Sequence, residues 1–299
     1  DVKDKVIEFE TGNVLIGSVS RLYMSNKCLL IADHKSVDKQ IHIFNKNDFS
    51  YLTSIGNFGE GPEEITVMGC LAIDEAHHQL YVSDHAKQKI FSYDMDSVMV
   101  DSLYKPQVKT AMNETLFPSE YQYINDTLSI AVLIKPTSTS TFNQFLGRWN
   151  MNTGEMIPMK YTRPDIQKKR ITFAASEKAG IYVECYTRHD LMTICSLDGE
   201  LLYNIYGPDW DGGNGNKLQS FGTVMIGNDK IFVSYCGEDY ARDSFPTKIL
   251  VFDLEGNYLK TLETGYKISD CCYDSFNNRI ILSLNDVVQF AYLDIDGII

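Results

Sequence analysis

Two aspartate–histidine pairs stand 51 residues apart in this chain, Asp33 with His34 and Asp84 with His85. Carboxylates and imidazoles repeated around a ring could hold a metal ion. The corresponding positions in the other four repeats, described below, are Leu133, Tyr186, Cys236 and Asn285. Because none of these is a carboxylate or an imidazole, the pattern does not continue. We expect Asp33 and Asp84 to accept hydrogen bonds from backbone N–H groups of nearby turns instead.

A second group of oxygen donors lies in the glycine-rich stretch "GPDWDGGNGNKLQS", residues 207–220. Asp209, Asp211 and Asn214 are the ligand types that calcium prefers on a loop. The EF-hand pattern is broken, because glycine stands at the fifth position and Ser220 replaces the closing glutamate at the twelfth. We predict no cofactor and an exposed turn here, with a calcium ion as the alternative.

The seven cysteines do not form a metal or redox motif. They are Cys28, Cys70, Cys185, Cys195, Cys236, Cys271 and Cys272, with no C-x-x-C pair among them. Free cysteine is among the most buried residue types, so we expect small buried apolar side chains. Disulfide bonds are the alternative.

Charge and composition bound the class of protein. The chain has 299 residues, 44% of them hydrophobic and 12% aromatic, and a net charge of −13. Such a charge repels phosphate backbones, so nucleic acid is not an expected partner. No apolar run approaches the length of a membrane helix. The chain starts "DVKDKV" without methionine, so we expect it to be processed or trimmed, with any signal or lipid-anchor segment upstream.

Six strand-like apolar segments recur at a spacing of 48 to 53 residues. They begin at Leu29, Leu80, Leu128, Ile181, Ile231 and Ile280. An earlier run precedes each segment, a second run follows it, and Asn-Gly or Asp-Gly turns separate many of the later runs. Four short strands in each of six units is the layout of a β-propeller. We predict an all-β, six-bladed β-propeller with four-stranded antiparallel blades, in one domain over residues 1–299.

The last repeat ends after three strands, whereas the chain begins with an unassigned strand, "KVIEFE" at residues 5–10. We predict that this N-terminal strand completes the last blade as its outer strand and closes the propeller. Only short, protected sheet edges would then remain.

Residues 55–94 contain, in order, the glycine-rich "GNFGEGPEEI" and the strand-like "AID", "LYVSD" and "KIFSYD". This order resembles the NHL-type propeller repeat, more faintly in the third unit. The whole chain resembles the TolB-like six-bladed propellers found as lipoproteins in the envelopes of Bacteroidetes, whose functions are mostly unassigned. The resemblance implies an extracytoplasmic location, in the periplasm or cell envelope, and a lipid anchor.

The same resemblance implies that "GNFGEGPEEI" is the crossover from the outer strand of one blade to the first strand of the next. A phosphate-binding loop is the alternative. Three glutamates, Glu60, Glu63 and Glu64, would repel an anion, and no lysine follows as in a P-loop. We therefore predict a structural crossover.

A propeller usually binds ligands at the mouth of its central channel, where the first strand of each blade begins. The repeat places these starts near Gly17, Met68, Glu120, Arg170, Gln219 and Asp270. The last four are polar or charged, and we predict that Glu120, Arg170, Gln219 and Asp270 bind a small polar ligand. In the alternative, they bond to one another around a water-filled tunnel.

Catalytic motifs are lacking: the chain has no G-x-S-x-G, H-E-x-x-H or C-x-x-C-H sequence. We predict a non-enzymatic binding or scaffolding propeller of the bacterial cell envelope, with a ligand or protein partner on a disc face or at the channel mouth. The alternative is a calcium-dependent hydrolase, similar to lactonases or esterases, with its site in the channel. Arg170 and Met68 at the predicted channel mouth disfavour that alternative.

Two loops are candidates for contacting a partner. "IKPTSTSTFNQF", residues 134–145, is rich in serine and threonine, and "RPDIQKKR", residues 163–170, is basic in an acidic chain. Long loops on a rigid scaffold often carry function. A hairpin tip and a solvated crossover are the alternative interpretations.

Overall fold

The recurring apolar segments are central strands. In the computed structural model, which describes residues 1–214 and 217–299, each segment pairs with a strand on both sides. In blade 1, every residue of the central strand, Cys28–Asp33, is buried. A strand buried on both faces needs a continuous apolar run rather than an alternating one. The repeat in the sequence therefore marks the second strand of each blade.

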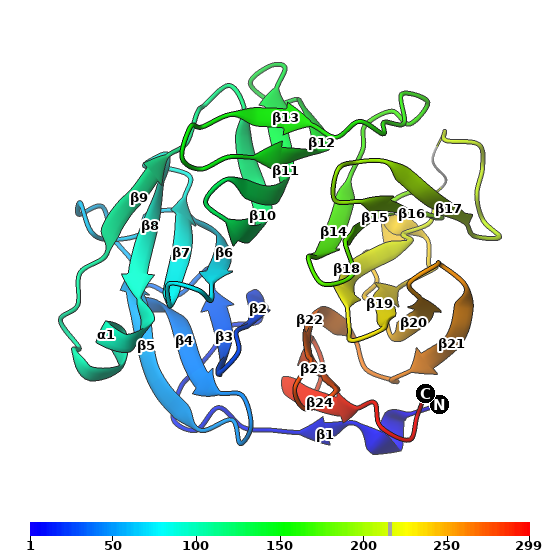
Figure 1. Cartoon of the computed structure of the whole chain (residues 1–299). Coiled ribbons are helices and arrows are strands. Elements are labelled where there is room, and N and C mark those ends of the chain that lie inside the picture. Colours follow the sequence, from blue (N-terminus) through cyan, green and yellow to red (C-terminus); the bar gives the residue numbers. More distant parts are fainter. Residues whose placement is uncertain (215–216) are drawn as a thin grey trace. The chain divides into compact units, whose positions relative to one another are not determined.

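The described residues form six four-stranded antiparallel sheets, so the chain is a six-bladed β-propeller as predicted (Figure 1). Blade 1 contains β2 (Ser20–Met24), β3 (Cys28–Asp33), β4 (Lys39–Asn45) and β5 (Tyr51–Asn57). Blade 2 contains β6 (Met68–Asp74), β7 (Gln79–Asp84), β8 (Lys89–Asp94) and β9 (Gln107–Ala111). Blade 3 contains β10 (Phe117–Asn125), β11 (Leu128–Pro136), β12 (Phe142–Trp149) and β13 (Met156–Pro158).

The remaining blades repeat this order. Blade 4 contains β14 (Ile171–Ser176), β15 (Ile181–Tyr186), β16 (Leu191–Ser196) and β17 (Leu201–Tyr206). Blade 5 contains β18 (Phe221–Ile226), β19 (Lys230–Tyr235), β20 (Lys248–Asp253) and β21 (Tyr258–Glu263). Blade 6 contains β22 (Ile268–Asp274), β23 (Arg279–Leu284), β24 (Phe290–Asp294) and β1 (Ile7–Glu8). Short helices are η1 (Lys3–Lys5), α1 (Met95–Val100) and η2 (Tyr240–Arg242).

The chain divides into two compact units. The first unit is Glu10–Pro158 and contains blades 1 to 3. The second unit combines Asp1–Phe9 with Met159–Ile299 and contains blades 4 to 6. The single domain over residues 1–299 stays a prediction.

The N-terminal strand β1 is the outer strand of blade 6. It pairs antiparallel with β24, with Ile7 opposite Tyr292, and it is shorter than the predicted strand at residues 5–10. Stacking of Phe9 on Phe290, with ring centroids 5.9 Å apart, holds the segment beyond the strand. Burial of Val2 in the core of blades 5 and 6 holds the other end.

The glycine-rich stretch after β5 is the predicted crossover, because β5 ends at Asn57 and β6 begins at Met68. One of its glutamates, Glu64, has a structural role that the sequence did not indicate. The Glu64 carboxylate accepts the N–H of Gly61 at 2.9 Å, inside the loop. A Cβ on Gly59 or Gly61 would lie 2.4 or 2.6 Å from that carboxylate. A side chain at either position would displace the Glu64 carboxylate, so the two glycines leave room for it inside the loop.

The serine- and threonine-rich insertion is shorter than predicted. Ile134 of β11 pairs with Gln144 of β12, and the ladder continues to Pro136 opposite Phe142. Only residues 137–141 lie outside the strands, where Thr137 and Thr141 bond to each other. The polar run therefore extends a hairpin and ends in a tight tip.

No helix among residues 1–214 and 217–299 is long and apolar enough to cross a membrane.

Candidate functional site

The predicted ligand residue Glu120 lies in β10 and forms an ion pair with Arg21 of β2. Both side chains are about one-third exposed, at 34% for Glu120 and 38% for Arg21. The pair joins the first strands of blades 1 and 3 within the first unit. Sequence reasoning missed Arg21, which lies one residue after the start of β2.

The other three predicted residues lie in the second unit. Thr187 N–H donates to the Arg170 carbonyl at 2.9 Å, and Ser220 N–H donates to the Thr187 carbonyl at 2.8 Å. Thr187 therefore links the starts of blades 4 and 5, beside Gln219. Asp270 is buried, and its carboxylate accepts the Thr223 hydroxyl of blade 5 at 2.9 Å. Ligand binding by these residues stays a prediction.

The repeated aspartates bind backbone N–H groups as predicted. Asp33 accepts the N–H of Gly17 at 2.9 Å, and Asp84 accepts the N–H of Thr66 at 2.8 Å. Each carboxylate ties the segment before the first strand of its blade to the end of the second strand. Metal binding is not needed to explain this repeat.

The histidines that follow these aspartates lie between blades. His34 Nε2 bonds to the Gly69 carbonyl of β6 at 3.1 Å, and the His85 ring packs on Phe117 of β10, with centroids 5.7 Å apart. Burial lowers the pKa of both imidazoles, which favours the neutral form. The 51-residue spacing of the two Asp-His pairs was the feature of the sequence that could have predicted this contact with the next blade.

In the candidate calcium loop, the Asp209 N–H donates to the buried Asp190 carboxylate at 2.9 Å. Asp211 and Asn214 are exposed, and residues 215 and 216 of the loop lie outside the described residues. Within residues 1–214 and 217–299, no three His, Cys, Asp or Glu side chains gather into a metal site.

All seven cysteines are free and buried, as predicted. Burial raises the pKa of several of these thiols, most strongly Cys185, Cys271 and Cys272, so they stay protonated at neutral pH. Their structural role is that of small core residues.

In the basic segment at residues 163–170, Arg163 donates two hydrogen bonds to Asp165, at 2.9 and 2.6 Å. It also donates to the Tyr206 hydroxyl at 3.0 Å and stacks over the Trp210 ring. The guanidinium thus joins the segment to β17 and to the following loop.

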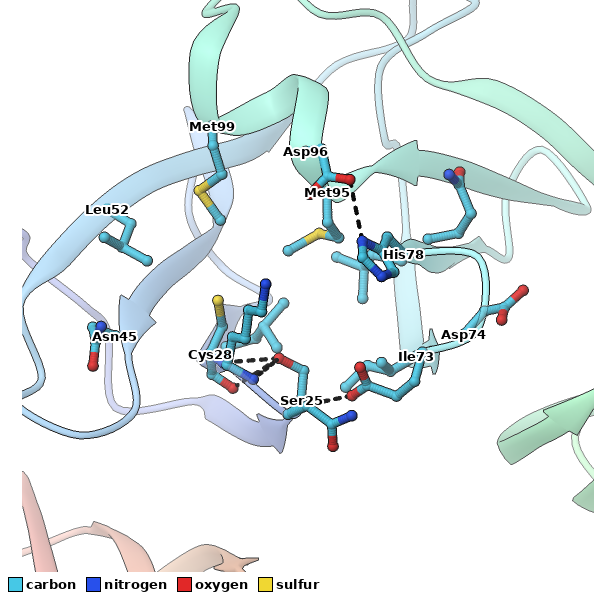
Figure 2. A pocket seen from close by; sticks show the side chains of 16 residues that line it. Ser25, Cys28, Asn45, Leu52, Ile73, Asp74, His78, Met95, Asp96 and Met99 are labelled. Carbon is cyan, nitrogen blue, oxygen red and sulfur yellow. Dashed lines mark hydrogen bonds and ion pairs between the residues drawn. The ribbon is translucent and has the colours of Figure 1, made fainter. Parts of the chain in front are cut away.

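A cavity of about 540 Å³ lies between blades 1 and 2 of the first unit (Figure 2). The turn between β2 and β3 and the turn between β6 and β7 form its rim, and α1 forms one wall. Since the first strands end at these turns, the cavity is at the opposite end of blades 1 and 2 from the predicted strand starts at Gly17 and Met68. No candidate residue named from the sequence lines it, apart from Cys28.

Helix α1 is positioned by hydrogen bonds at its first turn. The Asp94 carboxylate caps it by accepting the Ser97 N–H at 2.9 Å. His78, held at a φ of 52°, accepts the Met95 N–H at 2.9 Å with its carbonyl. The His78 ring also bonds to Asp96 at 3.1 Å. These bonds tie α1 to the turn between β6 and β7, across the cavity rim.

The walls of the cavity are largely apolar. Met95 and Met99 stand one helical turn apart and therefore share a face of α1. Figure 2 shows both side chains directed into the cavity, with Leu52 of β5 and Cys28 of β3 facing the same space. Methionine adapts its shape readily, so this wall can accommodate differently shaped apolar groups.

The polar groups of the cavity have an excess of negative charge. Asp74, Glu75 and Asp96 line it, against one lysine, Lys27. Glu75 accepts the Asn26 N–H at 2.7 Å and so joins the turns of blades 1 and 2. Burial would raise the pKa of Asp74, but bonds from Tyr81 and His77 outweigh it and lower the pKa. The Asp74 carboxylate is therefore ionised at neutral pH.

Comparison with known proteins supports the fold. A family model, DUF5128, described as a 6-bladed beta-propeller, matches residues 3–144. No curated protein sequence matches the chain. The TolB-like and NHL-like assignments stay predictions.

Solved structures match over nearly the whole chain at low identity. A Bacteroides fragilis protein provisionally named an exported protein is 14% identical, with a TM-score of 0.60, covering 93% of this chain and 82% of its own. A DUF4221 family member from Bacteroides vulgatus is 10% identical, with a TM-score of 0.65 and coverages of 96% and 94%. The β-propeller domain of Cps50 (Swd1) from Myceliophteria thermophila is 10% identical, with a TM-score of 0.57 and coverages of 96% and 98%. At these identities the matches show the fold alone.

Proposed function

We propose that this chain is a binding module outside the cytoplasm, and that it takes a small organic cation with an apolar body into the cavity between blades 1 and 2. The observation that carries the proposal is the cavity itself, which combines a methionine and leucine wall with an excess of carboxylates. The name of the Bacteroides fragilis neighbour supports the location. A lipid anchor and the cell envelope stay part of this proposal.

The expected ligand is an alkyl amine, a guanidine, or a lysine or arginine side chain of a peptide. Its hydrocarbon part would contact Met95, Met99 and Leu52, and its charge would approach Glu75 and Asp96. The overall charge of −13 adds to this preference, because it attracts cations over a distance. Burial of the apolar part supplies most of the binding free energy, about 25 cal/mol per Å².

A thermal-shift series tests the proposal with alkyl amines and guanidines of increasing chain length, each paired with the alcohol and the carboxylate of equal length. A ligand at a hundredfold its dissociation constant adds about 2.7 kcal/mol of stability. We expect the cations to raise Tm, more so with longer chains, and the carboxylates to leave it unchanged. Equal Tm shifts with the alcohols would show that the positive charge of the ligand does not contribute to binding. If no compound shifts Tm, the cavity is not the binding site for these ligands.

Matched variants locate the binding. The double substitution Glu75→Gln with Asp96→Asn should weaken cation binding by about fivefold, as expected for removing partly exposed charges. Asp48→Asn, an exposed aspartate outside the cavity lining, should bind as the wild type does. If both variants lose affinity equally, the cation is held by the general charge of the protein and not by the cavity.

A further inference from the structure

The outer strands of the six blades differ in how their free edges are protected. An exposed apolar edge strand pairs readily with another strand, and proteins prevent this with charges, proline, short length or a covering element. In the second unit, β21 carries Lys260 and Glu263, and β1 has only two residues. Both of these edges are protected against pairing.

The outer strands of the first unit are protected as well. Strand β9 carries Lys109, which bonds to Asp126 at 2.9 Å. Strand β13 has three residues and ends at Pro158. Strand β5 has no charged residue, but α1 packs against it (Figure 1).

Strand β17 has none of these features. Its six residues, "LLYNIY" from Leu201 to Tyr206, include no charge, proline or glycine. Four of its side chains are exposed, at 41% for Leu201, 46% for Leu202, 43% for Tyr203 and 48% for Tyr206. A β-bulge interrupts its pairing with β16, but β5, β9 and β21 have the same irregularity, so the bulge does not distinguish it.

Neighbouring residues cover a face of β17 and leave its edge open. Tyr161 accepts a hydrogen bond from the Asn204 amide at 2.9 Å, and Arg163 donates to Tyr206 at 3.0 Å. Because Asn204 and Thr193 bond side chain to side chain, Asn204 points to the sheet face and not to the edge. Among the described residues, β17 lies at the end of its sheet and pairs only with β16.

We infer that β17 is a contact edge between two copies of this chain, which add their β17 strands to each other antiparallel about a two-fold axis. The strand is self-complementary, because apolar residues occur at both ends. Antiparallel pairing sets Leu201 and Leu202 of one copy against the Tyr206 end of the other. The same patch serves both copies, as a two-fold contact requires.

Local charge permits this pairing despite the net charge of −13. At one end of β17, Glu200 is paired with Lys160 at 2.9 Å. At the other end, Asp165 is paired with Arg163 at 2.6 Å. Two copies therefore meet along an edge of neutral ion pairs and apolar side chains, and more distant charges are screened beyond about 8 Å at physiological salt.

Sedimentation velocity and hydrogen exchange test the inference at protein concentrations up to about 1 mM. We expect wild type to form a dimer as concentration rises, with exchange slowing at residues 201–206 and unchanged at residues 258–263. Leu202→Lys and Tyr203→Lys should each abolish the dimer. Leu259→Lys is the matched control, because Leu259 is 45% exposed on β21, whose edge already carries Lys260.

Circular dichroism and the thermal midpoint establish that each variant is folded before its association is compared. A wild type that is monomeric at every concentration would overturn the inference. So would a dimer that survives both β17 substitutions, or one that Leu259→Lys disrupts equally. The protein could also stay monomeric and show slowed hydrogen exchange in β17 only when an apolar peptide is added. That result would assign the edge to a different partner and would also overturn pairing between copies.

Discussion

The carboxylate of Asp84 accepts the backbone N–H of Thr66 at 2.8 Å, across 18 residues of chain. The same carboxylate accepts the N–H of Val67 at 3.1 Å and the N–H of Ala86 at 3.0 Å. One fully buried side chain thereby fixes both the segment that leads into β6 and the turn that follows β7. The stability of blade 2 should depend strongly on it.

Substituting Asp84→Ala should lower the free energy of unfolding by about 3–5 kcal/mol, because several backbone N–H groups lose their acceptor and Lys87 loses its ion-pair partner. Urea unfolding of the two proteins measures the difference. Asp48→Ala is the control, since Asp48 is exposed and accepts a local N–H from Ser50. Similar losses in both variants would show that Asp84 has no special role.

The free energy of unfolding should depend on pH partly through the ionisation of Asp84. Burial alone would raise the pKa of its carboxyl, but the N–H groups of Thr66 and Val67, with Lys87, lower it below its ordinary value. A depressed acid pKa stabilises the fold fully above the unfolded value of about 3.9, and this contribution is lost as pH falls below it.

Urea midpoints of wild type and Asp84→Asn, measured from neutral pH down to about pH 3, test this prediction. The wild type should lose stability more steeply than the variant below about pH 4. Parallel curves for the two proteins would show that the pKa of Asp84 does not change on folding.

A side chain at Gly207 should destabilise the protein by overpacking. A Cβ at this position would lie 2.1 to 2.2 Å from the buried Asp190 carboxylate. Gly207→Ala should therefore cost about 1–3 kcal/mol, as overpacking of a filled site does. Thermal or urea unfolding measures this cost.

Gly154→Ala serves as its control, because no atom lies within 4 Å of the added Cβ, although φ is +79°. That variant should lose about 1 kcal/mol from backbone strain alone. Asp190→Ala in the Gly207→Ala background should recover part of the loss if the carboxylate causes it. If Asp190→Ala recovers none of the lost stability, the clash of the added methyl group is with another part of the loop and not with the Asp190 carboxylate.

The ion pair between Arg21 and Glu120 should contribute little to stability. Both side chains are about one-third exposed, and exposed pairs contribute about 0.2–1 kcal/mol. A double-mutant cycle with Arg21→Ala and Glu120→Ala measures the coupling directly. A coupling energy well above that range would mean that the first strands of blades 1 and 3 depend on this contact.

Much of the fold follows from local pattern. The starts of the first strands, estimated from the repeat, fall within three residues of the observed ones, with Met68 at the start of β6 itself and Asp270 two residues after the start of β22. The pattern is reliable because a strand buried on both faces must be apolar throughout, and antiparallel neighbours require turns of known composition. The side chains near those starts were predicted less well, since Arg21 and Thr223 were not anticipated as partners.

The sequence by itself determined the blades, the crossovers, the outer N-terminal strand and the role of Asp33 and Asp84. Each of these depends on strand pattern or on a short polar side chain beside a turn. Only the tertiary structure revealed the cavity, because it brings Asn26 beside Glu75, 49 residues away, and places α1 over both. No motif encodes such a site, since its residues come from turns that meet only when neighbouring sheets pack.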